Sequence, residues 1–143
     1  QAILFEAAQV RPMGRIATGV KGISLSEGDY VIGLDKYREG ADVLIVTKNG
    51  YGKRVQLNEF KTQNRGGKGV KSIELTDKNG EVVAAKVVSE EDELVLLTSE
   101  GQIIRLEVED ISVQKRYARG VLLMRLPEND HVVSMARFRT EQE

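Results

Sequence analysis

Residues 43–48 read VLIVTK and residues 53–57 read KRVQL, and the turn sequence Asn49-Gly50 lies between them. The first run is rich in β-branched side chains, and the second alternates polar with apolar residues as a half-buried strand does. Residues 70–76 (VKSIELT) also alternate, and residues 77–80 (DKNG) join them to a second apolar run at 81–88. An Asn-Gly pair suits a tight hairpin turn with positive φ. These runs predict four short antiparallel strands.

The same plan recurs at a step of 50 to 51 residues. Gly-Val pairs lie at 19–20, 69–70 and 120–121, and Arg15, Arg65 and Arg116 keep the same step. The runs ELVLLT (93–98), QIIRLEV (102–108), GVLLMRL (120–126) and HVVSMARF (131–138) repeat the four strands. We predict three units of about four strands each, at 1–42, 43–92 and 93–143, all in one domain. Short helical turns are expected only at 58–61 and 109–112.

Four short antiparallel strands recurring at this period are typical of a propeller, in which repeated blades surround an axis. The sequence therefore predicts an all-β, propeller-like fold, with a sandwich or an open barrel as the alternative. Residues 1–5 align with the strand that begins at Gln102, so the first unit lacks its leading strand. We expect the chain to be part of a longer array, or to close a ring by self-association.

The composition excludes several classes of function. The chain has 143 residues and no cysteine, which excludes a disulfide framework and thiol chemistry. The sequence holds no apolar run of about 18 residues, so no membrane segment is predicted. The formal net charge is −1, from 21 basic and 22 acidic residues. A near-neutral total favours a nucleic-acid partner only if the basic residues gather on one surface.

The basic residues do gather along the sequence. Residues 61–71 carry four basic side chains and no acid, and the counterparts 11–21 and 115–125 also lack acids. If equivalent positions of successive units are equivalent in space, these loops form one basic belt that suits a phosphate backbone. Gly66, Gly67 and Gly69 would let backbone N–H groups approach phosphate oxygens.

Residues 63–69, Gln-Asn-Arg-Gly-Gly-Lys-Gly, resemble the gyrase box, the Q-basic-R-G-G-basic-G heptapeptide found in the C-terminal domain of the DNA gyrase A subunit. Residues 10–15, 18–23, 49–54 and 92–98 are similar to stretches of the later blades of that domain. The resemblance implies the last three blades of a six-bladed β-pinwheel that wraps duplex DNA without sequence preference and so supports supercoiling. This sequence departs from the family pattern in two ways. Asn64 stands at a normally basic position, and the box lies in the second unit, which aligns with a later blade, whereas the decisive box of the family lies in the first blade. The topoisomerase IV A subunit, a paralogue, is also similar.

The resemblance further implies the partners and the location. The partners would be double-stranded DNA and the rest of a topoisomerase A subunit, which links the chain to the ATPase subunit. The location would be the bacterial cytoplasm, at the nucleoid. The expected DNA-contacting residues are Arg15, Lys21, Lys53, Arg54, Gln63, Arg65, Gly66, Gly67, Lys68, Gly69, Lys71, Lys115, Arg116 and Arg119.

No catalytic residue, cofactor or metal site is predicted in this chain. His131 is the only histidine, and no catalytic triad can be assembled around it. The acidic run 90–93 lacks the spaced ligands of a calcium loop, and residues 50–53 (GYGK) lack the rest of a phosphate-binding loop. The resemblance places the DNA-cleaving tyrosine of a type II topoisomerase in another domain. A protein-interaction propeller without nucleic-acid binding is the alternative function.

Overall fold

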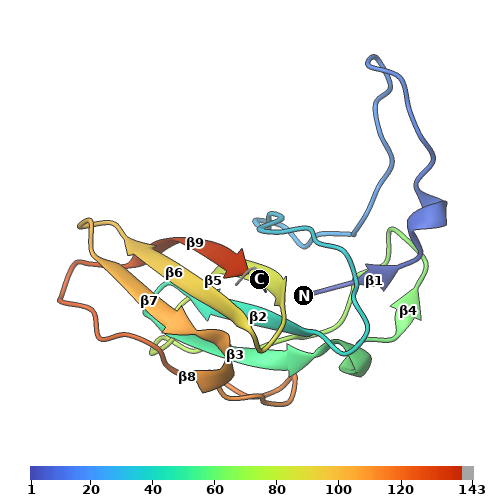
Figure 1. Cartoon of the computed structure of the whole chain (residues 1–143). Coiled ribbons are helices and arrows are strands. Elements are labelled where there is room, and N and C mark those ends of the chain that lie inside the picture. Colours follow the sequence, from blue (N-terminus) through green and yellow to red (C-terminus); the bar gives the residue numbers. More distant parts are fainter. Residues whose placement is uncertain (140–143) are drawn as a thin grey trace.

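The computed structural model describes residues 1–139, in which strands and three short 3-10 turns form three sheets (Figure 1). The strands are β1 (Leu4–Phe5), β2 (Asp42–Thr47), β3 (Tyr51–Gln56), β4 (Thr62–Gln63), β5 (Val82–Val88), β6 (Asp92–Thr98), β7 (Ile103–Glu107), β8 (Val121–Leu122) and β9 (Val132–Arg139), and the turns are η1 (Ala7–Gln9), η2 (Leu57–Glu59) and η3 (Val108–Asp110). The sheet orders are β5-β2-β3-β8, β7-β6-β9 and the parallel pair β1-β4. The two larger sheets are antiparallel throughout.

The central strand β2 is covered on both of its faces. Leu44 and Val46 point to one face and join the apolar cluster that lies between the two larger sheets. Ile45 and Val43 point to the other face and join a second cluster with residues of the first unit, including Ala2 and Leu4. A strand that is covered on both faces reads as a continuous apolar run, which explains why VLIV carries no polar alternation.

Most of the predicted strands are confirmed. The runs at 43–48, 53–57, 93–98, 102–108 and 131–138 become β2, β3, β6, β7 and β9, and the run at 81–88 becomes β5. The two predicted helical turns correspond to η2 and η3, each of which begins one residue and ends two residues earlier than expected, and η1 is a third turn that was not predicted. The all-β prediction holds, and no helix among residues 1–139 is long and apolar enough to cross a membrane.

Two predicted strands are wrong in extent and in partner. Residues 70–76 form no strand, and only Val70 makes a β-bridge, to Ala2 of the first unit. Of residues 120–126, only β8 forms, and it pairs with β3 of the second unit. The predicted hairpin between 70–76 and 81–88 is therefore absent, because β5 pairs with β2 instead. In both cases the segment pairs with the preceding unit and not with its own.

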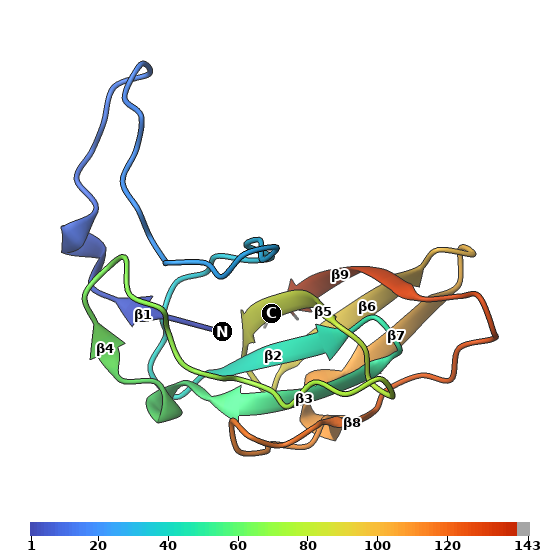
Figure 2. The same ribbon diagram turned by 180° about the vertical axis from the view of Figure 1, so that it is seen from behind.

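The first unit differs most from the expected plan. Between η1 and β2, residues 10–41 contain no strand, and part of this segment projects from the rest of the molecule as a long open loop (Figures 1 and 2). The equivalent strands β5 and β9 each pair with a central strand, β2 and β6. The boundaries of the three units stay a prediction.

Candidate nucleic-acid interface

The basic loop of the third unit lies along the outer edge of β3 in the second unit. The Arg54 N–H donates to the Ser112 carbonyl (3.0 Å), and the Gln114 N–H donates to the Arg54 carbonyl (2.8 Å). After leaving the edge there, the chain returns to it where Val121 pairs with Gly52. Loop 114–120 is therefore a bulge held at both of its ends, and it covers a strand edge that would otherwise be unpaired.

The box of the second unit is seated in the same way on the first unit. Strand β4, which ends at the first box residue Gln63, pairs in parallel with β1, and after the box Ala2 and Val70 exchange two backbone hydrogen bonds of 2.8 and 2.7 Å. The last glycine of each loop lies against the strand below it. A Cβ on Gly69 would lie 2.5 Å from the Ala2 carbonyl oxygen, and a Cβ on Gly120 would lie 2.9 Å from that of Gly52.

Equivalent arginines join each loop to the loop before it. The Arg65 guanidinium donates to the backbone carbonyls of Lys21 (2.6 Å) and Gln9 (3.2 Å). One step later, Arg116 donates to the carbonyl of Lys71 (2.9 Å), which is the counterpart of Lys21. Arg15, the first of the three, is exposed.

Backbone hydrogen bonds reinforce this series. The Ser24 N–H donates to the Gly67 carbonyl (2.8 Å), and at the equivalent place the Glu74 N–H donates to the Ala118 carbonyl (3.2 Å). The Gly66 N–H donates to the Gly22 carbonyl (2.7 Å). Segment 9–24, segment 63–74 (the box and the residues that follow it) and loop 114–120 thus contact one another in sequence order. We call these three segments the loop series.

Several cations of the loop series face solvent. Lys68 is exposed on the box, and Lys115 and Arg119 are exposed on loop 114–120. Segment 9–24 adds exposed Arg15 and Lys21. The partly buried members are Arg65, Lys71 and Arg116; Lys71 forms an ion pair with Glu74, and the Arg116 guanidinium lies 5.0 Å from the centre of the Tyr117 ring. The five exposed cations can reach a phosphate without breaking a described contact.

Lys53 and Arg54, predicted to contact DNA, are both buried. The Lys53 side chain is 0% exposed, and its Nζ donates to the carbonyls of Lys115 (2.7 Å), Arg116 (3.0 Å) and Ala118 (2.9 Å). Burial lowers the pKa of Lys53 to about 8. A cation that is enclosed by protein carbonyls cannot also meet a phosphate.

Arg54 is held by acceptors of its own. Its guanidinium donates to the Ile111 carbonyl (2.7 Å) and to an Asp42 carboxylate oxygen (3.2 Å). Burial raises the pKa of Asp42, although the Arg54 charge acts in the opposite direction. Glu90 lies 3.7 Å from the same guanidinium. Arg54 therefore joins β2, β3 and the segment after η3.

The box glycines have packing roles that differ from the predicted phosphate contacts. Because the Gly66 N–H already donates to Gly22, it is not free for a phosphate oxygen. Gly69 has a φ of +75°, which lets the chain turn onto Ala2. At Gly67, an added Cβ would lie 3.3 Å from the Gln63 Oε1 atom and from the Ile3 Cδ1 atom. Gln63 and these glycines therefore contribute to the packing of the box.

The sequence also contains a box counterpart that the prediction missed. Residues 114–120 read Gln-Lys-Arg-Tyr-Ala-Arg-Gly, which matches residues 63–69 at a step of 51 in both the glutamine and the final glycine. Lys115 stands where the box has Asn64, so the cation absent from the second unit is present in the third. The step between the arginines was the signal that could have found it.

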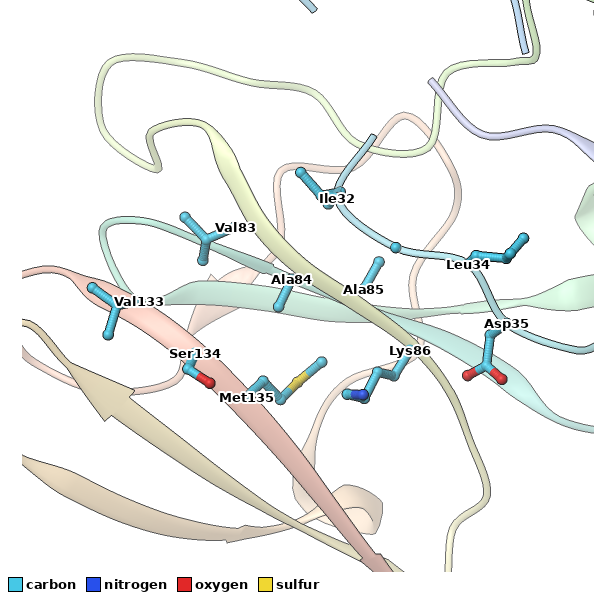
Figure 3. A pocket seen from close by; sticks show the side chains of 11 residues that line it. Ile32, Leu34, Asp35, Val83, Ala84, Ala85, Lys86, Val133, Ser134 and Met135 are labelled. Carbon is cyan, nitrogen blue, oxygen red and sulfur yellow. The ribbon is translucent and has the colours of Figure 1, made fainter. Parts of the chain in front are cut away.

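A pocket of about 250 Å³ lies where equivalent segments of the three units converge (Figure 3). Residues 32–35 line it together with parts of β5 and β9. Burial would raise the pKa of Asp35, but the Val87 and Lys36 N–H groups and the Arg137 charge hold it below its usual value. Among residues 1–139, no group of three or more histidine or acidic side chains is placed to hold a metal ion.

Comparison with known proteins gives consistent matches. A family model described as "DNA gyrase C-terminal domain, beta-propeller" matches residues 1–37, 41–89 and 92–139. The DNA gyrase A subunit of Staphylococcus aureus strain NCTC 8325 is 47% identical over 143 residues, which cover 99% of this chain and 16% of that protein. The chain thus spans about a sixth of the length of such curated relatives.

Two solved structures are also similar. A DNA gyrase A C-terminal domain superposes with a TM-score of 0.87 at 36% identity, over 94% of this chain and 46% of that one. The C-terminal domain of a DNA topoisomerase IV superposes with a TM-score of 0.88 at 28% identity, over 94% of this chain and 42% of that one. With the family match, these superpositions confirm the propeller class predicted from the repeat.

Proposed function

We propose that this chain, which belongs to the DNA gyrase C-terminal domain family, binds duplex DNA without sequence preference and bends it along the loop series. The observation that carries the proposal is that three equivalent loops, each bearing exposed cations, are joined by hydrogen bonds in sequence order. A duplex that follows these loops meets positive charge at each step.

The electrostatics suit binding without sequence preference. DNA carries one negative charge per about 1.7 Å of helix axis, and each neutralised phosphate releases counterions into solution. Lysine and arginine side chains on loops contact phosphates without reading bases. Bending 20 to 30 base pairs by 40 to 90° costs on the order of 1 to 6 kcal/mol, so several contacts must act together.

The proposed contact set is smaller than the one expected from sequence. It comprises five exposed cations, Arg15, Lys21, Lys68, Lys115 and Arg119, with Arg65, Lys71 and Arg116 at the edge of the surface. Gln63, Gly66, Gly67 and Gly69 contribute by shaping the box. Lys53 and Arg54 are removed from the set, because both are buried.

In this proposal the chain is the DNA-wrapping part of a type II topoisomerase A subunit. It supports supercoiling by that enzyme and leaves strand cleavage and ATP hydrolysis to other domains and to the ATPase subunit. Such a role places it in the bacterial cytoplasm at the nucleoid. The 47% identity to a gyrase A subunit favours gyrase over topoisomerase IV as the parent enzyme.

A salt titration of duplex binding tests the proposal. If about six phosphates are neutralised, the affinity falls by roughly 10³ or more between 50 and 200 mM salt. In the variant Lys68→Gln/Lys115→Gln/Arg119→Gln, the slope of log affinity against log salt should fall by about 2 to 3. The charge-matched control Lys36→Gln/Lys78→Gln/Arg139→Gln removes exposed cations outside the loop series.

Equal losses in the two triple variants would mean that the loop series is not the binding surface. No binding by the unaltered chain would favour a protein-interaction propeller instead. Bending is tested separately, by relaxing a circular plasmid in the presence of the chain and measuring the linking number. A linking number that is unchanged at saturating protein would limit the function to binding without wrapping.

A further inference from the structure

Lys53 occupies a position that is apolar in the other two units. Its counterparts at the 50-to-51-residue step are Ile3 and Ile104. Ile3 lies beneath the box 63–69, with its Cδ1 atom 3.3 Å from where a Cβ on Gly67 would be. Lys53 lies at the same place beneath loop 114–120, on the part of β3 between the two points where that loop is attached. A lysine thus replaces an apolar contact under one loop of the series.

The Lys53 ammonium has three N–H donors, and three loop carbonyls accept hydrogen bonds from it. Those carbonyls belong to Lys115, Arg116 and Ala118, at 2.7, 3.0 and 2.9 Å. A buried cation is tolerated only when such partners satisfy it, and the loss of any one of them leaves a buried polar group unpaired. The bonds fix the backbone at Lys115, at Arg116 and at Ala118, which precedes Arg119.

Apart from the equivalent contacts of Arg65 and Arg116, the two loops are held by different means. In the box 63–69, the Gly66 N–H and the Gly66 carbonyl are both engaged by segment 22–24, the latter through the Ser24 hydroxyl (2.6 Å). Loop 114–120 has Tyr117 and Ala118 where the box has its paired glycines. In loop 114–120, three backbone carbonyls accept hydrogen bonds from the Lys53 side chain.

We propose that Lys53 is a positioning residue for DNA binding, whose buried ammonium holds loop 114–120 in the shape that presents Lys115 and Arg119 to phosphates. This inference rests on the proposed function. It assigns to Lys53 an indirect action through the loop, in place of the direct phosphate contact expected from the sequence.

The number of donors makes the effect sensitive to protonation. A neutral amine has two N–H groups, so deprotonation removes one of the three hydrogen bonds from Lys53 to the loop. Burial lowers the pKa of Lys53 to about 8; Glu59 of η2, which favours the charged form, and Arg116 of the loop, which disfavours it, face the amine. Because the folded-state pKa lies below the unfolded value, this group makes the fold more stable as the pH rises from about 8 to about 10.5. The hold on the loop weakens as the folded chain loses this proton, around pH 8.

Lys53→Met tests the proposal, with Ile104→Met as the matched control at the equivalent position of β7. Amide hydrogen exchange at residues 115–119 should become about tenfold faster in Lys53→Met, with residues 64–68 unchanged as an internal reference. The slope of its log affinity for DNA against log salt should fall by up to about 2, because two cations are affected. The Ile104→Met control should change neither. Unchanged exchange at 115–119 in a folded Lys53→Met protein would overturn the proposal.

The pH profile separates positioning from a general effect on stability. In the unaltered chain, DNA affinity should fall between about pH 7 and 9 while stability in urea does not, and in Lys53→Met the affinity should be level over this range. The same fall in both proteins would refute the inference. If Lys53→Met does not fold, the ¹³Cε signal of Lys53 and the protection of amides 115–119 against exchange are followed against pH in the unaltered chain. A titration of Lys53 that leaves this protection unchanged refutes the inference.

These measurements also distinguish the inference from the proposed function. If the unaltered chain binds no DNA, the proposed function fails and the inference about DNA presentation fails with it, whatever the exchange result. If the chain binds DNA but the loop is indifferent to Lys53, only the positioning role is lost.

Discussion

Gly120→Ala probes the close backbone contact between loop 114–120 and β3. Gly120 has a φ of +85°, where an L side chain costs about 1 to 2 kcal/mol. The added Cβ would also lie 2.9, 3.1 and 3.3 Å from the carbonyl oxygen, the carbonyl carbon and the nitrogen of Gly52. All three atoms are backbone and cannot rotate away. Overpacking of this kind adds about 1 to 3 kcal/mol, so the free energy of unfolding should fall by about 2 to 5 kcal/mol.

Gly101→Ala is the matched control for backbone conformation. Gly101, in the turn between β6 and β7, has a φ of +83°, but a Cβ there would meet no atom within 4 Å. It should therefore cost only the conformational part, about 1 to 2 kcal/mol. The difference between the two variants isolates the close approach to Gly52.

Urea denaturation followed by circular dichroism measures both variants. A lower midpoint at unchanged m-value reports a change in stability alone. The reasoning predicts that Gly120→Ala loses about 1 to 3 kcal/mol more than Gly101→Ala. Equal losses of unfolding free energy would show that the contact with Gly52 can relax at no cost, and that Gly120 is needed only for its backbone conformation.

Three further predictions concern the core and the polar contacts. Leu44→Ala, which truncates a side chain that is 0% exposed between the two larger sheets, should cost about 2 to 5 kcal/mol in the same urea assay. Asn79→Ala should cost about 1 to 3 kcal/mol, because its amide joins the Glu74 and Arg119 carbonyls at 2.9 and 3.1 Å. Burial would raise the pKa of Asp130, but hydrogen bonds lower it, so its stabilisation should be complete above about pH 4 and lost as the pH falls through the lower folded value. In an acid titration of stability, Asp130→Asn should show a shallower fall.

The central strands could be predicted because their residues carry the signal locally. The β-branched run of β2 and the turn at Asn49-Gly50 are both present within the hairpin they form. The run at 70–76 misled because alternation reports one-sided burial, and not the presence of a hydrogen-bonded partner strand. Ile73 is buried in the cluster shared with the first unit, and Val70 bonds to Ala2, so the pattern is real although a continuous strand is absent.

The burial of Lys53 and Arg54 was not expected from the sequence, for a different reason. Charge along the sequence does not show whether a side chain points outward, and residues 53 and 54 flank a hairpin in a chain whose loops are basic. The repeat held the missing information. Since Ile3 and Ile104 are the counterparts of Lys53, a position that is apolar in two units faces the interior in the third. For Arg54, whose counterparts are Leu4 and the exposed Arg105, the repeat is ambiguous.

The pairing of each loop with the preceding unit bears on how such an array can grow. The Val70 bridge to Ala2 and the Val121 pairing with Gly52 join units that are neighbours in sequence, through the same positions. A duplicated stretch of about 50 residues would present the edge that its successor needs and supply the loop that its predecessor needs. Blade number can therefore change by whole repeats in a gene without new interfaces, whereas a cut at a repeat boundary would leave one edge bare.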